Sequence, residues 1–166
     1  MKTRIYNEGQ LIKERLAEIS DYIYNNPELG NEEYKAVEAL TTFLKEHNFQ
    51  VECPIADMDT AFKATFDSGK PGMTIGYLCE YDALPKIGHG CGHNMIGVMS
   101  SGAAVALSKV LDEIGGKIIV YGTPAEETNG GKVILAEAGV FDELDAAMIV
   151  HPDGETRASG SSSALY

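Results

Sequence analysis

One short stretch of the chain concentrates groups that can bind a metal ion. Residues 88–94 read Gly-His-Gly-Cys-Gly-His-Asn, so His89, Cys91 and His93 are separated only by single glycines. Glycine has no Cβ and adopts backbone angles that other residues avoid, which lets such a loop fold closely around a small ligand. Thiolate sulfur and imidazole nitrogen are donors that zinc and similar divalent ions prefer. The stretch is therefore the first candidate for a metal site.

Further side chains of the same kind follow segments that we predict to be strands. They are Glu80, Asp82, Glu126, Glu127 and His151. Open α/β sheets bind ligands beyond the carboxyl ends of their strands, so these groups could converge with Cys91 and His93 in one crevice. Thiolate, imidazole and carboxylate together form the donor set of a borderline-soft divalent ion. Zinc is the first expectation, with manganese or cobalt as alternatives.

The adjacent glutamates Glu126 and Glu127 can divide the work of metal-assisted hydrolysis. One can bind the metal while its neighbour stays free, holds a water, and acts as general base and then as acid to the leaving amine. Taken alone, the pair could also be the acidic start of a helix, which the helix dipole favours. His151 could likewise do no more than end a strand before Pro152.

The rest of the sequence predicts the elements that position these residues. Apolar residues at helical spacing predict helices over 11–25, 32–46, 95–114 and 132–138. Asn31 is placed to be the N-cap of the second helix. Short apolar runs bounded by turn residues predict strands over 50–53, 61–66, 73–79, 117–121 and 146–150. The alternation of buried strands with helices predicts an α/β sandwich with a mostly parallel sheet.

Composition and charge limit the partners. The chain has 166 residues, which suits one domain, and its 13 basic and 25 acidic residues give a net charge of −12. This balance argues against nucleic acid and against an anionic membrane surface. Three cysteines at irregular spacing fit a reducing compartment better than a disulfide framework. The N-terminus lacks a secretory signal and no segment approaches the roughly 20 apolar residues of a membrane span, so we expect a cytoplasmic protein.

Five motifs occur in order along the chain. They are Asn26-Pro-Glu-Leu-Gly30, Tyr81-Asp-Ala-Leu-Pro85, Gly88-His-Gly-Cys-Gly-His-Asn94, Gly122-Thr-Pro-Ala-Glu-Glu127 and His151-Pro152. Together they resemble the M20 family of metallopeptidases and amidohydrolases. The likeness is greatest to the branch that hydrolyses indole-acetyl and aminobenzoyl-glutamyl conjugates and to its dipeptidase-like relatives. The resemblance implies a zinc-exopeptidase-like three-layer sandwich, with a mixed, mostly parallel sheet and helices on both faces.

The resemblance also implies a role for each candidate residue. The implied ligands of a two-metal site are Cys91, which bridges the ions, His93, Glu127 and His151. Glu126 would be the general base, and Asp82 would orient a metal ligand without binding the metal itself. Glu80 stands where other branches have a histidine ligand, and its role stays open. His89 either contacts the site and its substrate or packs the loop.

The implied function is that of a metal-dependent hydrolase that cleaves the amide bond of N-acyl amino acids or small dipeptides. Residues 1–166 would be a catalytic metal-binding domain, incomplete at its C-terminus, from an enzyme that is a homodimer in full-length form. The lid or dimerisation domain and a last histidine ligand would be absent, and residues 160–166 begin to resemble a strand. The alternatives are a non-catalytic metal-binding or scaffold fragment of the same fold and a redox thiol at Cys91.

Overall fold

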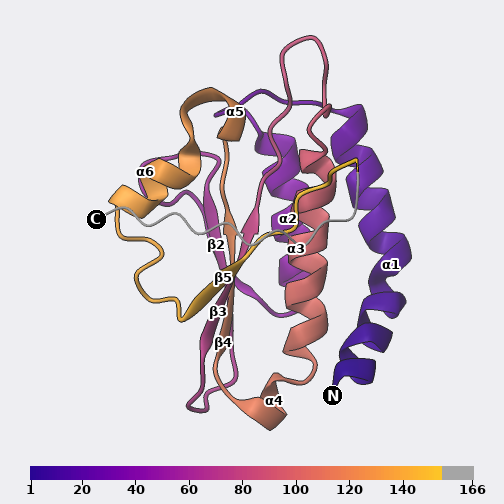
Figure 1. Ribbon diagram of the computed structural model, residues 1–166, viewed down its shortest axis with the longest axis vertical. Coiled ribbons are helices and arrows are strands. Elements are labelled where there is room, and N and C mark those ends of the chain that lie inside the picture. The colour runs from indigo at the N-terminus through magenta and orange to yellow at the C-terminus, as the bar shows by residue number, and fades with distance from the viewer. Residues whose placement is uncertain (155–166) are drawn as a thin grey trace.

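A mixed sheet forms the middle layer of the fold (Figure 1). The computed structural model describes residues 1–154, so the strand suggested for 160–166 lies outside the described part. The strands are β1 (Gln50–Glu52), β2 (Phe62–Asp67), β3 (Thr74–Cys79), β4 (Lys117–Gly122) and β5 (Ala146–Met148), in the spatial order β1-β2-β4-β3-β5. β3 pairs in parallel with β4 and β5, whereas β2 pairs antiparallel with β1 and β4. Among the described strands only β2 therefore runs against the others, as a mixed, mostly parallel sheet requires.

Helices cover both faces of this sheet (Figure 1). One face carries α1 (Lys2–Asn25), α2 (Tyr34–Glu46) and α3 (His93–Ser108), and the other carries α6 (Gly131–Glu137). The short helices α4 (Leu111–Ile114) and α5 (Glu126–Asn129) precede and follow β4. This arrangement confirms the expected three-layer α/β sandwich. In the part of the chain that the structure describes, no helix has the length and apolar character needed to cross a membrane.

β4 shows why the core has two parts. Its side chains alternate between the two faces of the sheet, and every residue from Ile118 to Gly122 is buried, as expected for a strand covered on both sides. Ile118 and Val120 belong to the large core beneath α1, α2 and α3. On the other face, the Tyr121 ring packs edge-on against Phe141 at a centroid distance of 5.2 Å. The second and smaller core, around α6, consists of Met58, Ala61 and Leu135 with partly buried neighbours.

The prediction that Asn31 caps the second helix is wrong. α2 begins at Tyr34, and Asn31 lies outside it with a left-handed backbone, at a φ of 69°. The capping group is instead the Glu28 carboxylate, which accepts hydrogen bonds from the backbone N–H groups of Lys35 at 2.8 Å and Ala36 at 3.1 Å. A carboxylate is favoured at this end of a helix by the free N–H groups and by the helix dipole.

Two helices also differ from the predicted boundaries. α1 begins at Lys2 instead of residue 11, since its first turns are exposed and carry no apolar stripe that the sequence could reveal. The helix predicted over 95–114 begins two residues earlier and divides into α3 and α4. The earlier start matters for function, because it makes His93 the first residue of α3.

Candidate metal centre

The edge of the sheet where β3, β4 and β5 end holds the candidate side chains. These strands are parallel to one another, so their carboxyl ends lie together. The predicted site residues all follow these strands or lie at the start of α3; they are Asp82, Cys91, His93, Glu126, Glu127 and His151. Gly92 precedes α3 with a φ of 76°, a left-handed conformation that glycine adopts without strain. This turn places His93, the first residue of α3, at the site.

His93 is the centre of the arrangement. Its Nδ1 lies 3.0 Å from both the backbone oxygen and the Oδ1 of Asp82. Since both partners are acceptors, Nδ1 carries a proton, and in the neutral form of the ring the lone pair lies on Nε2. Nε2 is buried without a hydrogen-bond partner among residues 1–154, and it lies 3.3 Å from Glu80 Oε2 and 3.8 Å from Glu127 Oε1. A buried lone pair that faces two carboxylates calls for a cation between them, either a proton or a metal ion.

Asp82 orients the His93 ring through its contacts with Nδ1. Its second oxygen, Oδ2, accepts a hydrogen bond of 3.0 Å from the backbone N–H of Glu127. Burial alone would raise the pKa of Asp82, but the hydrogen bonds with His93 and Glu127 outweigh it and keep the pKa below its usual range. The carboxylate therefore stays ionised and ties the start of α3 to the start of α5.

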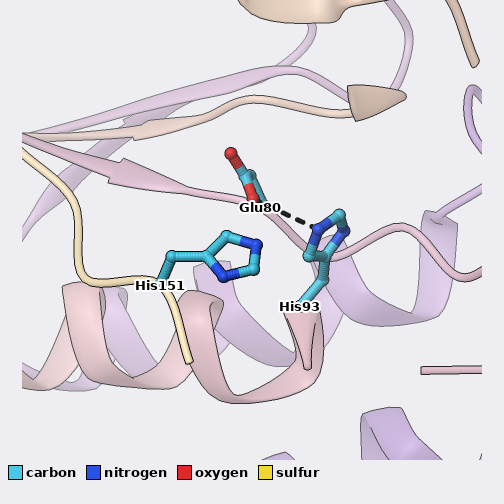
Figure 2. A group of neighbouring side chains, drawn as sticks. All are labelled: Glu80, His93 and His151. Carbon is cyan, nitrogen blue, oxygen red and sulfur yellow. Dashed lines mark ion pairs between the residues drawn. The ribbon is translucent and has the colours of Figure 1, made fainter. Parts of the chain in front are cut away.

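Two groups of donors meet at His93. One comprises Glu80, His93 and His151, and the other Cys91, His93 and Glu127, with the ligand atoms of each group within 4.8 Å of one another. Figure 2 shows the first group, in which the His151 ring lies edge-on to the His93 ring, at a centroid distance of 5.8 Å. Two ligands of one tetrahedral zinc ion, each at ~2.1 Å, lie about 3.4 Å apart. The distance of 3.3 Å between His93 Nε2 and Glu80 Oε2 fits that spacing.

Glu80 is the site residue whose role the sequence left open. Its carboxylate is 4% exposed, and Oε1 accepts a hydrogen bond from the Lys132 ammonium while Oε2 has no hydrogen-bond partner in the described chain. A buried carboxylate with one free oxygen facing His93 can serve as a metal ligand. The sequence signal that could have indicated this role was the position of Glu80 directly after β3, two residues before Asp82.

Cys91 lies beside Glu127, and this decides its chemistry in the metal-free protein. The Glu127 carboxylate, chiefly through a hydrogen bond with the thiol, raises the pKa of Cys91 to about 11. Only the thiolate is an effective nucleophile, so this environment disfavours the redox-thiol hypothesis at neutral pH. A bound metal would reverse the effect, since a coordinating thiol is deprotonated outright.

The two remaining candidates lie beside the donor groups and belong to neither of them. Glu126 is half-buried and opens α5 next to Glu127. The pair does begin a short helix, as one of the two alternatives predicted, and Glu127 is also one of the clustered donors. His89 is buried, 6.5 Å from the ring of Tyr24 between centroids. A surface pocket of about 440 Å³ beside it is lined by Cys91 and His151, among others, and is large enough for a small substrate.

Comparisons with known proteins agree with this geometry. No family model matches the chain. It is 41% identical over 162 residues to the Xaa-Arg dipeptidase of Mus musculus and 36% identical over 160 residues to a p-aminobenzoyl-glutamate hydrolase chain of Escherichia coli. These matches cover 87% and 85% of the chain. Among solved structures, it superposes with a TM-score of 0.74 on the Bacillus subtilis YXEP protein, a dinuclear metal-binding peptidase of the M20 family, at 24% identity. The chain belongs to the M20 family.

The match to M20 proteins covers most of this chain and a smaller share of its relatives. The chain spans 36% of the mouse dipeptidase, 33% of the Escherichia coli hydrolase chain and 42% of the YXEP chain. A candidate aminohydrolase from methicillin-resistant Staphylococcus aureus superposes with a TM-score of 0.79 at 29% identity and covers 89% of this chain.

Proposed function

We propose that the protein is a metal-dependent hydrolase that cleaves the amide bond of N-acyl amino acids or small dipeptides. The observation that carries the proposal is the cluster of Cys91, His93 and Glu127 next to Glu126, a carboxylate outside both donor groups. A binding module has no need for a free base beside its metal ligands. The names of the relatives, a dipeptidase and an aminobenzoyl-glutamate hydrolase, support an amide as the bond that is cleaved.

Each residue has a defined task in this proposal. The ion would be held by Cys91, His93, Glu127, His151 and, as the structure adds, Glu80. When bound, a divalent ion supplies Lewis acidity, which polarises a carbonyl and makes a water more acidic. Glu126 takes a proton from the attacking water and gives it to the leaving amine. Asp82 keeps the proton of His93 on Nδ1 and so leaves Nε2 free to bind the ion.

The metal and the assembly are also proposals. Zinc fits the mixed sulfur, nitrogen and oxygen donors best, with manganese or cobalt as alternatives. Two donor groups suit two ions. The role of Cys91 as the bridge between the ions is carried over from the resemblance to M20 proteins, since Cys91 belongs to only one of the two groups. We further propose that residues 1–166 form part of a catalytic domain whose full-length form is a cytoplasmic homodimer, with neither nucleic acid nor membrane as a partner.

The test is metal removal and reconstitution of the full-length protein. Chelation is expected to abolish cleavage of a panel of dipeptides and N-acyl amino acids, and zinc, manganese or cobalt is expected to restore it. Circular dichroism before and after chelation checks that the fold persists. If no metal restores cleavage of any substrate while the fold is intact, the non-catalytic scaffold becomes the better account.

A further inference from the structure

A buried glutamate outside the donor groups contacts the turn that carries Glu126 and Glu127. Glu33 lies just before α2 and is 0% exposed. Its Oε1 accepts a hydrogen bond of 2.8 Å from the backbone N–H of Ala125, and its Oε2 accepts one of 2.7 Å from Thr60 Oγ1. Figure 1 shows the connection between α1 and α2 crossing the top of the molecule to reach α5. The carboxylate therefore joins a segment distant in sequence to the start of α5.

The residue that Glu33 holds has an unfavourable backbone. Ala125 has a φ of 57° and a ψ of 38°, the left-handed conformation, which is unfavourable for a residue with a Cβ. Ala125 is also fully buried and immediately precedes Glu126. Such a conformation persists only where the surroundings enforce it. The hydrogen bond from its N–H to Glu33 is one contact that does so.

Neighbouring residues of the same segment strengthen the contact. A Cβ added at Gly30 would lie 2.9 Å from Ala125 Cα and 2.3 Å from Thr128 Oγ1, so only glycine allows this close approach to α5. The backbone oxygen of Glu28 accepts a hydrogen bond of 2.8 Å from the N–H of Ala83, in the loop that carries Asp82. The segment from Glu28 to Glu33 thus braces the loops that follow both β3 and β4.

Ionisation of the buried Glu33 carboxyl lowers the stability of the fold. Burial raises the pKa of Glu33 above its ordinary 4.5, and the hydrogen bonds from Thr60 and Ala125 offset this only in part. A carboxyl whose pKa is higher in the folded than in the unfolded protein stabilises the fold in its protonated form. That contribution is lost as the pH rises through the folded-state pKa, so at neutral pH the charge lowers the free energy of unfolding. A costly buried charge beside a site indicates a functional role.

We propose that Glu33 is a positioning residue of the metal centre, whose carboxylate fixes Ala125 in the left-handed conformation and thereby places Glu126 and Glu127. This inference rests on the proposed function, because it takes Glu127 as a metal ligand and Glu126 as the base. Glu33 touches neither the donor groups nor the pocket beside them. Among the described residues, its direct link to the turn that carries Glu126 and Glu127 is the hydrogen bond from the backbone N–H of Ala125. A second and longer route runs through Thr60, whose backbone oxygen accepts a hydrogen bond from the Tyr81 hydroxyl.

The test compares variants of nearly equal volume by cobalt(II) titration. Glu33→Met removes the acceptor, whereas Glu33→Gln keeps an oxygen that can accept from Ala125 N–H. We expect Glu33→Met to weaken cobalt binding about 10–100-fold, the range for partners that orient ligands, and Glu33→Gln to stay within about 3-fold of wild type. Thr60→Val, which removes only the other hydrogen bond of Glu33, should also stay within about 3-fold. Adding Ala125→Gly to Glu33→Met should recover affinity, since glycine adopts positive φ freely.

Melting temperatures separate positioning from general stability. At pH 7, Glu33→Gln is expected to melt at or above the wild-type temperature, because the buried charge is gone. Equal cobalt affinity in wild type and folded Glu33→Met would overturn the inference and leave the proposed function intact, whereas absence of cobalt binding in wild type would overturn the proposed function itself. If Glu33→Met does not fold, amide hydrogen exchange of Ala125 in wild type decides: protection equal to that of β4 supports the inference, and loop-like exchange overturns it.

Discussion

Replacement of His93 by alanine is expected to abolish metal binding almost completely. His93 is the residue that belongs to both donor groups, and its Nε2 faces Glu80 at 3.3 Å and Glu127 at 3.8 Å. Loss of a partner that merely orients a ligand costs about 10–100-fold in metal affinity, so loss of a direct ligand should cost more than 100-fold. Competition between the protein and a chromophoric chelator for zinc measures the change.

His89→Ala is the matched control for this variant. His89 is an imidazole in the same loop, it is 7% exposed, and it belongs to neither donor group. We expect its zinc affinity to stay within a few-fold of wild type, although the cavity left by a buried ring should lower its melting temperature. Zinc affinity that falls equally in both variants would mean that the loop responds to any disruption, and the assignment of His93 as a metal ligand would fail.

Glu126→Gln is expected to lower the turnover of full-length protein about 10²–10⁴-fold and to leave its zinc content unchanged. The amide cannot accept a proton from the attacking water, and general-base catalysis contributes a factor of that size. Glu126 lies in neither donor group, so its replacement removes no ligand. Steady-state kinetics with metal analysis of the same sample provide both quantities.

Glu127→Gln serves as the matched comparison, since it makes the same replacement of a carboxylate by an amide at the adjacent residue. It should lose metal affinity together with turnover, because Glu127 is one of the donors near His93 Nε2. If Glu126→Gln instead loses metal and Glu127→Gln keeps it, the roles of the two glutamates are reversed. If Glu126→Gln has no effect on any measured function, the scaffold interpretation is supported.

The sequence predicted that the candidate side chains lie together, because strand ends are easy to locate. The apolar run Lys117–Tyr121 and the polar residues after it place Glu126 and Glu127 beyond a buried strand, and the structure agrees. Parallel pairing of β3, β4 and β5 then follows from the alternation of strands and helices. Local pattern and general topology were sufficient to bring Cys91, His93 and His151 to one edge.

Sequence patterns could not predict the side-chain contacts between segments that are distant along the chain. Glu28 and Glu33 appear in the sequence as two of several acidic residues between α1 and α2, yet one caps α2 and the other holds Ala125 across 92 positions. The prediction for Asn31 was wrong for the same reason. Asn31 was the residue of a preferred capping type nearest to the predicted start of the helix, but the group that caps α2 is the Glu28 carboxylate. Burial of a charged side chain depends on tertiary packing, and no local signal reports it.

Cobalt(II) titration of the wild-type chain and of Cys91→Ser tests the central claim most directly. The claim is that Cys91, His93 and Glu127 form a centre for a divalent ion, with the thiol as a ligand. We expect wild type to develop a sulfur-to-cobalt charge-transfer band that saturates at a fixed molar ratio, and Cys91→Ser to lack this band. Cobalt binding without the band, or a band that persists in Cys91→Ser, would contradict the account.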